Sequence, residues 1–328
     1  MNNKLPVIAF TLGDPGGNGP EIVFKTLDYF SSSYPFIPIV FGSEAVLKHP
    51  YLKSVINNKK ITYLTPDTQL ESNILYFCNC YEMTNLVIKK PSKLNGEAAY
   101  NYITTAVDYI KKGIADALVT APICKESFDL AKIKFTGHTT LLKHLTDVKD
   151  VSMAFHTPNY DVLLATIHVA LKDVSSMITK DLITRKLEDL VLFQRQLGKK
   201  RIRIAVAGLN PHAGENGMFG MEEKDVLIPL IDTLDFGKDV ILTGPYSADT
   251  LFYRANKGEF DCVLAMYHDQ GLIPVKLNSF HDAVNTTIGL PFVRTSPDHG
   301  TAFDRAYSTA SSIDSFLAAT RLAIRMLG

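Results

Sequence analysis

VIAFTLGDPGGNGPEIVFKTLDYF, residues 7–30, contains the unit from which the fold is built. Its first six residues form an almost continuous apolar run, which is typical of a strand buried on both faces of a parallel sheet. Gly13-Asp14-Pro15 ends this strand. Pro20 then suits the first turn of a helix, predicted over Glu21–Phe30, that is apolar on one face. A strand, a polar loop and an amphipathic helix in this order predict an α/β protein.

The same alternation continues along the chain. Further strands are predicted at Phe36–Phe41, Ala117–Thr120, Val162–Ile167, Ile202–Leu209, Val240–Thr243 and Cys262–Met266. Helical periodicity predicts helices over Glu97–Lys112 and Asp314–Leu327. The 328 residues are too many for one ordinary core, so we expect two domains or one large α/β unit.

The amino-acid composition argues against several classes of protein. Lys and Arg together number 34, as do Asp and Glu, so no positive excess points to nucleic acid or an anionic membrane. The four cysteines form no C-x-x-C motif, and we interpret them as reduced, mostly buried thiols. No stretch approaches the ~20 apolar residues of a membrane helix. We therefore expect a cytoplasmic protein.

Several familiar fingerprints are missing. Gly17-Asn18-Gly19 is followed by Ile22 where G-x-G-x-x-G requires its third glycine, which disfavours a Rossmann fold. The sequence also contains no P-loop, no H-E-x-x-H and no G-x-S-x-G motif. Any nucleotide must therefore be bound by a different structural motif.

Three histidines follow predicted strands. His168, His212 and His268 come after Val162–Ile167, Ile202–Leu209 and Cys262–Met266. Parallel strands bring their carboxyl ends to one edge of a sheet, where ligands of open α/β sheets bind. Three neutral imidazoles at that edge suit a divalent metal with open positions for substrate. The alternative, that each is a hydrogen-bonded loop histidine, stays open on position alone.

Other polar residues cluster near the same predicted edges. Lys125, Lys276 and Arg294, with His138, Thr139 and Asn285, could clamp a phosphate or carboxylate, or the cations could be solvated surface charge. Asp249 could orient a ligand histidine or move a proton, or it could cap the helix that begins there.

The polar segments also resemble a known family. In order and spacing, TLGDPGGNGPE, VTAPICK, FTGHTTLL, ATIHVALKDV, GLNPHAGENGMFGMEE, GPYSADTLF, AMYHDQGLIPVK and VNTTIGLPFVRTSPDHGTAFD resemble the 4-hydroxythreonine-4-phosphate dehydrogenase family. Two departures stand out. Gly16-Gly17-Asn18 replaces the usual Ala-Gly-Ile, and Cys124 stands where Asn or His is common.

The resemblance implies a two-domain fold like that of isocitrate and isopropylmalate dehydrogenases, not a Rossmann fold. It places residues 1–125 with 280–328 in a first, discontinuous domain. Residues 126–279 then form a second domain that carries a dimer interface. It further implies a homodimer with the active site at the interface.

By motif position, the resemblance assigns the metal ligands to His168, His212 and His268, one of them supplied by the partner subunit. The metal would be Zn, with Co, Ni, Mn or Mg as alternatives. Substrate binding falls on His138, Thr139, Lys276, Asn285 and Arg294. The turn Asp298-His299-Gly300-Thr301 resembles the superfamily's adenosine-binding loop and so implies NAD, or NADP, at that position.

The activity implied is NAD-dependent oxidation and decarboxylation of 4-phosphohydroxy-L-threonine in pyridoxal 5′-phosphate biosynthesis. Paralogues that oxidise 4-phospho-threonate or 4-phospho-erythronate are the nearest alternative. A coenzyme A-dependent acyl or phosphoryl transferase and a non-catalytic phosphometabolite-binding protein are the others.

Overall fold

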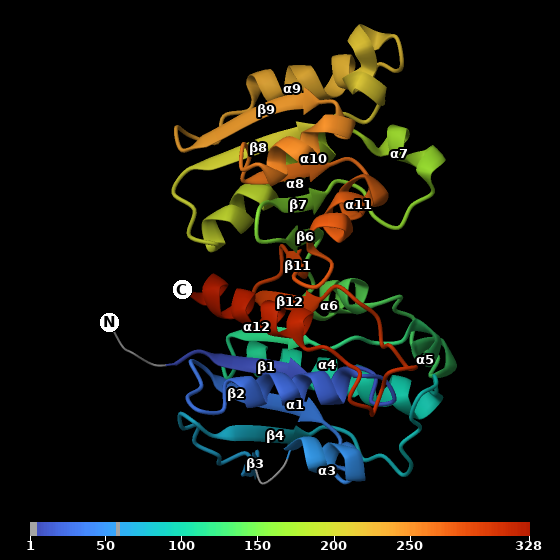
Figure 1. The fold of residues 1–328 in the computed structure, drawn as a ribbon, viewed down its shortest axis with the longest axis vertical. Helices are drawn as coiled ribbons and strands as arrows, with labels where there is room; N and C mark the ends of the chain where they lie inside the picture. Colours follow the sequence, from blue (N-terminus) through green and yellow to red (C-terminus); the bar gives the residue numbers. More distant parts are fainter. Residues whose placement is uncertain (1–4, 57–59) are drawn as a thin grey trace. The chain divides into compact units, whose positions relative to one another are not determined.

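The computed structural model describes residues 5–56 and 60–328, in two compact units. The first unit contains the described residues up to Asp150 together with Leu290–Leu327, and the second is Val151–Gly289. The first unit is thus built from both ends of the chain (Figure 1). The sequence analysis set the changes of domain at 125/126 and 279/280, whereas the units change at 150/151 and 289/290.

The sheet of the first unit is parallel throughout, in the order β3-β4-β2-β1-β5-β12. Its strands are β1 (Val7–Thr11), β2 (Ile37–Gly42), β3 (Ile61–Tyr63), β4 (Leu75–Asn79), β5 (Ala117–Thr120) and β12 (Val293–Pro297). Every residue of β1 is buried, as its continuous apolar run predicts.

Helices cover both faces of this sheet. They are α1 (Gly19–Tyr29), α2 (Glu44–Leu47), α3 (Pro50–Ile56), α4 (Lys93–Lys111), α5 (Lys125–Leu130), α6 (His138–Thr146) and α12 (Asp314–Leu327). Figure 1 shows α1 and α12 on one face and α4 on the other. The bounds predicted for α12 are confirmed. α4 begins four residues before the predicted Glu97, because the Ser92 side chain caps it by accepting from the backbone N–H of Asn95.

The second unit has a mixed sheet, in the order β11-β6-β7-β10-β8-β9. Its strands are β6 (Ser152–His156), β7 (Asp161–Leu164), β8 (Ile202–Ala207), β9 (Val240–Tyr246), β10 (Cys262–Ala265) and β11 (Val284–Ile288). β7, β10, β8 and β9 run parallel, while β6 is antiparallel to both of its neighbours. The predicted α/β class is confirmed in both units.

Helical segments follow the strands of the second unit. They are α7 (Leu171–Met177), α8 (Lys180–Gln196), η1 (Pro211–Gly217), η2 (Glu223–Leu227), α9 (Ile228–Thr233), α10 (Ala248–Asn256) and α11 (His268–Ser279). α8 packs on β6, β7 and β10, and α11 packs on β7 and β10. On the face covered by α10 and α11, buried apolar side chains such as Val162, Leu164, Val263 and Ala265 form a core cluster.

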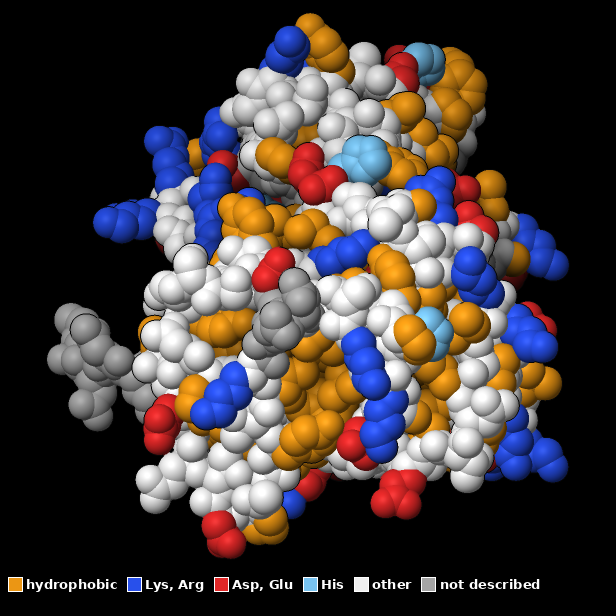
Figure 2. All heavy atoms as spheres, turned by 60° about the horizontal axis from the view of Figure 1, so that its bottom comes forward, with side chains coloured by type: hydrophobic (Ala, Val, Ile, Leu, Met, Phe, Trp, Pro, Cys, Tyr) orange, Lys and Arg blue, Asp and Glu red, His pale blue; other side chains and the backbone are white. Residues whose placement is uncertain are grey.

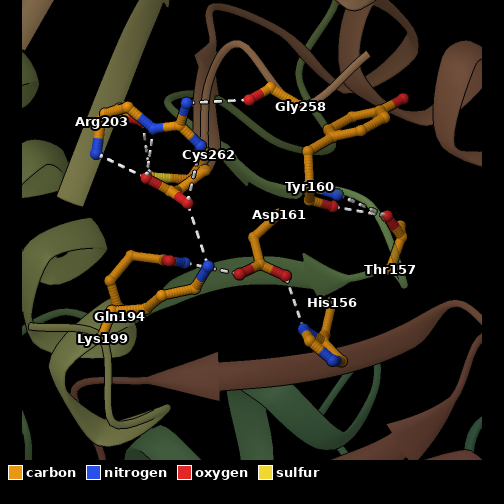
Figure 3. A network of polar contacts seen from close by, with 10 residues as sticks. His156, Thr157, Tyr160, Asp161, Gln194, Lys199, Arg203, Gly258 and Cys262 are labelled. Carbon is orange, nitrogen blue, oxygen red and sulfur yellow. Dashed lines mark hydrogen bonds and ion pairs between the residues drawn. The ribbon is translucent and has the colours of Figure 1, made fainter. Parts of the chain in front are cut away.

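A polar network joins the amino ends of β7, β8 and β10 (Figure 3). Asp161 accepts hydrogen bonds from His156 Nδ1 at 2.6 Å and Gln194 Nε2 at 2.5 Å. Asp261 binds the Arg203 guanidinium, with Nε to Oδ2 at 3.0 Å. These contacts lie at the opposite strand ends from His168 and His268, so we interpret the network as structural.

The surface carries both signs of charge. Figure 2 shows Lys and Arg side chains interspersed with Asp and Glu on the visible face, in keeping with a formal net charge of zero. Among the described residues, no helix is both long enough and apolar enough to cross a membrane.

Candidate functional site

His168 and His268 lie together at the carboxyl edge of the second unit's sheet. Their ring centroids are 5.8 Å apart. The neighbouring strands β7 and β10 explain this, since Thr166 ties the two strand ends together. Its Oγ1 donates to the carbonyl of Met266 at 2.7 Å, and its backbone N–H donates to the same oxygen at 3.2 Å.

His268 is the first residue of α11 and is oriented by its neighbour. Its Nδ1 lies 2.7 Å from Asp269 Oδ1. A carboxylate at Nδ1 fixes the ring tautomer and leaves Nε2 as the lone-pair donor, which is the usual arrangement around metal-binding histidines. Gln270 holds the adjacent backbone: its Oε1 accepts from Met266 N–H at 2.6 Å, and its Nε2 donates to Gly208 O at 2.7 Å.

His212 stands on a left-handed turn after β8. The residues of this turn, His212–Asn216, all have positive φ, from 41° at Glu215 to 81° at Gly214. Such a backbone costs about 1–2 kcal/mol for each residue other than glycine. His168 is also in this region, with φ 39°. Strained backbone concentrates at functional sites, where surrounding contacts hold it in place.

Glu223 is the residue that holds the start of the turn. It is 2% exposed. Its Oε1 accepts from the backbone N–H groups of Leu209 at 2.7 Å and Asn210 at 2.8 Å, and its Oε2 accepts from Asn210 Nδ2 at 2.9 Å. A Cβ on Gly214 would lie 2.7 Å from Glu223 Oε2, so the turn requires glycine there. Glu223 is the last residue of the motif GLNPHAGENGMFGMEE, and the sequence alone predicts no role for it.

Histidine side chains are suitable ligands for a divalent metal, but the three predicted ligands do not all lie close together in this structure. Within residues 5–56 and 60–328, no group of three His, Cys, Asp or Glu side chains is placed to hold a metal ion. His168 and His268 are the pair that the structure brings together. A pair of imidazole rings with a carboxylate behind one of them fits a divalent metal that takes its remaining ligands from elsewhere.

A cavity of about 350 Å³ adjoins this pair. It is lined by Thr166, Ile167, His168, Val169, Leu171, Val174, Tyr267, His268 and Asp269. Its walls are mostly apolar with a few convergent polar groups, which is typical of a small-molecule site.

Asp249 lies in the first turn of α10 and interacts electrostatically with His212. It is exposed in the first turn of α10, and its Oδ1 accepts from Ser247 Oγ at 2.7 Å. The Ser247 hydrogen bond is the largest cause that lowers the pKa of Asp249, and His212 adds a smaller electrostatic effect. The N-cap residue of α10 is Ser247, so Asp249 is not the cap of this helix, and its role in proton transfer or orientation stays a prediction.

In the first unit, Arg294 is a buried cation. It is 2% exposed, on β12, and its Nη2 donates to Thr120 Oγ1 on β5 at 2.8 Å. Burial lowers the pKa of Arg294 to about 9, so an anion beside it would favour the charged guanidinium.

His138 and Thr139 are the first two residues of α6, in the same unit. Burial lowers the pKa of His138 well below its ordinary value, and the charge of Arg294 lowers it further. The Nε2 atom of His138 is buried and makes no hydrogen bond within the described residues. A neutral imidazole beside a buried guanidinium is a suitable anion-binding pair.

Lys276 and Asn285 belong to the second unit. Lys276 lies on α11 with its Nζ 5.3 Å from the centroid of the Phe280 ring. Asn285 lies on β11 and pairs with Phe155 of β6.

The turn Asp298–Thr301 follows β12 and packs against the glycine-rich loop after β1. Thr301 O accepts from the backbone N–H of Asn18 at 2.8 Å. A Cβ on Gly17 would lie 2.8 Å from Thr301 O, so this close approach requires glycine. Within the turn, His299 Nδ1 donates to Gly300 O at 2.8 Å.

Two buried side-chain oxygens in the loop and helix after β1 make no hydrogen bond to the described residues. They are Asn18 Oδ1 and Glu21 Oε1, on side chains that are 4% and 1% exposed. Buried acceptors without donors commonly mark a site that a ligand or water completes. Neither residue is among the predicted site residues, although Asn18 belongs to one of the departures from the family pattern.

Comparisons with known proteins agree on one family. The profile described as pyridoxal phosphate biosynthetic protein PdxA matches residues 36–323. The 4-hydroxythreonine-4-phosphate dehydrogenase of Desulforapulum autotrophicum is 39% identical over 337 residues, covering 98% of this chain and 96% of the relative. The D-threonate 4-phosphate dehydrogenase of Cupriavidus necator is 39% identical over 329 residues, covering 98% and 97%.

A solved structure shows the same fold. The 4-hydroxythreonine-4-phosphate dehydrogenase of Klebsiella pneumoniae matches with a TM-score of 0.85 at 35% identity, over 99% of both chains.

Proposed function

The chain belongs to the PdxA family, and from this we propose that it oxidises 4-phosphohydroxy-L-threonine with NAD and decarboxylates the product to 3-amino-2-oxopropyl phosphate. The family makes the chain an oxidoreductase of the dehydrogenase type. The proposed place of the reaction is pyridoxal 5′-phosphate biosynthesis in the cytoplasm. The proposed cofactor is NAD, with NADP as its alternative.

The observation that carries the proposal is the pairing of His168 with His268 beside a cavity of about 350 Å³. We propose that these rings and His212 hold a divalent metal, Zn or alternatively Co, Ni, Mn or Mg. One of the three would come from the partner subunit of a homodimer. When bound, such an ion lowers the pKa of a coordinated hydroxyl and polarises a neighbouring carbonyl. His268 supplies an oriented lone pair, because Asp269 fixes its tautomer.

We assign recognition of the substrate phosphate to Arg294, His138 and Thr139, with Lys276 and Asn285 as further substrate contacts. Thr120 orients the Arg294 guanidinium, which presents a planar fork of donors to phosphate oxygens. Because His138 is neutral, it adds a hydrogen bond without adding charge. Binding energy from the phosphate then serves to orient the reacting carbon.

Asp298, His299, Gly300 and Thr301 are the residues we assign to the dinucleotide. The fit rests on the contact between Thr301 and Asn18 and on the buried acceptors next to it. We assign Asp249 a secondary role near His212, in proton transfer or orientation.

A second candidate substrate is D-threonate 4-phosphate. The Cupriavidus necator relative that bears this name is as similar to the chain, at 39% identity, as the Desulforapulum autotrophicum relative. At one carbon, 4-phosphohydroxy-L-threonine carries an amino group where D-threonate 4-phosphate carries a hydroxyl group.

An absorbance assay of NADH formation tests the proposal. The purified protein is offered 4-phosphohydroxy-L-threonine or D-threonate 4-phosphate with NAD, before and after treatment with a chelator. We expect NADH from the first substrate, loss of activity with the chelator and recovery on adding Zn²⁺. A preference for D-threonate 4-phosphate would move the chain to the second function. Activity that persists in the presence of the chelator would contradict the proposed metal. The absence of NADH with both substrates would contradict both candidate functions.

A further inference from the structure

A long irregular segment connects the last strand and the last helix of the first unit. Residues 298–313, all of them described, join β12 to α12 without forming a helix or a strand (Figure 1). Irregular connections longer than about 12–15 residues are uncommon and are usually functional or disordered. Two non-glycine residues of this segment have a left-handed backbone, Ala302 with φ 42° and Tyr307 with φ 54°. Such a backbone persists only when its surroundings hold it in place.

The first four residues of the segment form the turn to which we assign the dinucleotide. The inner side of this turn is packed, because Thr301 O accepts from the backbone N–H of Asn18 at 2.8 Å. Its tip is open. His299 and Gly300 are exposed, and a Cβ on Gly300 would lie within 4 Å of no heavy atom of the described residues apart from its chain neighbours. The tip is thus accessible to a ligand, while its position depends on the backbone behind it.

Three hydrogen bonds tie the middle of the segment to the rest of the first unit. The hydroxyl of Tyr307 donates to Pro15 O, in the glycine-rich loop, at 2.5 Å. The backbone N–H of Ser308 donates to Glu21 Oε2, on α1, at 3.2 Å. The hydroxyl of Tyr51, on α3, donates to Ser308 O. We call Glu21, Tyr51 and Tyr307 the anchor residues.

The anchor residues are packed as well as hydrogen-bonded. Glu21 is 1% exposed and lies in the first turn of α1, where the helix dipole favours a carboxylate. The ring of Tyr307 has its centroid 4.6 Å from that of His49 and 6.3 Å from that of Tyr51. Pro15 belongs to the same loop as the residue that packs against the turn. The anchor and the turn are therefore held against one surface.

We propose that Glu21, Tyr51 and Tyr307 are positioning residues for the dinucleotide. They hold residues 298–313 in the shape that presents the turn 298–301, and they act through that turn rather than by contact with the cofactor. The inference rests on the proposed function, which assigns the dinucleotide to this turn. A segment that is already ordered loses less conformational entropy when a ligand binds. The anchor residues should therefore increase affinity for NAD and leave the chemical step and phosphate recognition unaffected.

Tyr307→Phe and Tyr51→Phe test this, because each removes one hydroxyl and keeps the ring. Isothermal titration of the intact chain should show the Kd for NAD raised by about 3–10-fold, the usual effect of losing one hydrogen bond. KM for NAD should rise by the same factor, with kcat and KM for the phosphorylated substrate unchanged. Hydrogen–deuterium exchange should be faster in the peptide that covers residues 298–313. Adding NAD to the wild type should slow exchange in that peptide.

Tyr76→Phe is the matched control. The Tyr76 hydroxyl accepts from the backbone N–H of Glu71 at 2.8 Å and donates to Gln69 O at 3.3 Å, in the loop between β3 and β4 of the same unit. Its loss should lower the urea midpoint about as much as Tyr307→Phe does, and it should leave the Kd for NAD unchanged.

The outcomes separate this inference from the proposed function. A wild type that binds NAD, with the same Kd in Tyr307→Phe and Tyr51→Phe, would contradict the positioning role alone. An equal rise in Kd from Tyr76→Phe, or a fall in kcat as large as the rise in KM, would show a general loss of structure instead. A wild type that binds no NAD would contradict the proposed cofactor, and the positioning role with it.

Discussion

The imidazole rings of His168 and His268 lie with their centroids 5.8 Å apart and their planes inclined by 39°. They come from different strand ends, and His168 is held at a positive φ of 39°. A non-glycine residue in that region costs of order 1–3 kcal/mol and persists only when its surroundings hold it there. The strain and the pairing together support the proposal that this pair binds a ligand.

Replacing His268 by Ala should abolish stoichiometric Zn²⁺ binding while the circular dichroism stays native. Asp269→Asn should weaken binding by about 10–100-fold, the usual effect of losing a partner that orients a ligand. Isothermal titration with Zn²⁺ measures both effects. His281→Ala is the control, since His281 is exposed in the same unit and does not line the cavity. Equal losses from His268→Ala and His281→Ala would show that the metal binds surface histidines nonspecifically.

Thr120→Val should weaken recognition of the substrate phosphate through Arg294. The hydroxyl of Thr120 accepts from Arg294 Nη2 at 2.8 Å, and a hydrogen bond to a charged group is worth about 1.5–3 kcal/mol. KM for the phosphorylated substrate should therefore rise by about 10–100-fold, and Arg294→Lys should raise it at least as far. Arg305→Ala, at an exposed position, should leave KM unchanged. An equal rise in KM for the unphosphorylated analogue would show that Thr120 and Arg294 do not recognise the phosphate.

Much of the fold could be predicted from local patterns. β1 and β5 are short, continuous apolar runs followed by polar loops, and both were predicted closely. β3, with three residues, and β6, with the sequence SMAFH, have no such pattern and were missed. β6 also pairs with β11, which lies far along the chain, and a local window does not contain that information.

The site could be predicted only in part, for the same reason. His168 and His268 were expected at one sheet edge, and the pairing of β7 with β10 places them there. The left-handed turn that carries His212 could not be foreseen. Its sequence, PHAGENG, contains two glycines, and the residue that anchors it, Glu223, stands 13 residues after Asn210. Asn18 and Glu21 do not stand out in the sequence, because a buried side-chain oxygen without a hydrogen bond is a property of the whole fold.

Glu223→Gln should loosen the turn that presents His212. The carboxylate accepts three hydrogen bonds, from Leu209 N–H, Asn210 N–H and Asn210 Nδ2, and an amide turns one of its acceptors into a donor. A donor facing a donor in a buried position costs about 1–3 kcal/mol, which urea unfolding would detect. Zn²⁺ affinity should fall as well, because His212 loses its fixed position. Glu222→Gln is the neighbouring control, since Glu222 accepts from the Asn210 side chain but not from the backbone of the turn. Lower stability with unchanged Zn²⁺ affinity would make Glu223 a structural residue alone.

The neutral state of His138 makes stability depend on pH. Burial and the charge of Arg294 hold its pKa in the folded protein well below 6.5, whereas an unfolded histidine titrates near its ordinary value of about 6.5. As pH falls below that value, the unfolded chain takes up a proton that the folded chain does not. The stability contributed is therefore complete above about pH 6.5 and is lost progressively until the folded pKa is reached. Titration of one group changes the free energy of unfolding by at most about 1.4 kcal/mol per pH unit.

Urea unfolding at about pH 7.5 and pH 5.5 should therefore show a smaller loss of stability for His138→Gln than for the wild type. Thr139→Val, which changes the next residue without removing a titrating group, should keep the wild-type difference. Equal losses in the wild type and His138→Gln would mean that the pKa of His138 is not lowered in the folded protein, which would contradict its burial as a neutral ring beside Arg294.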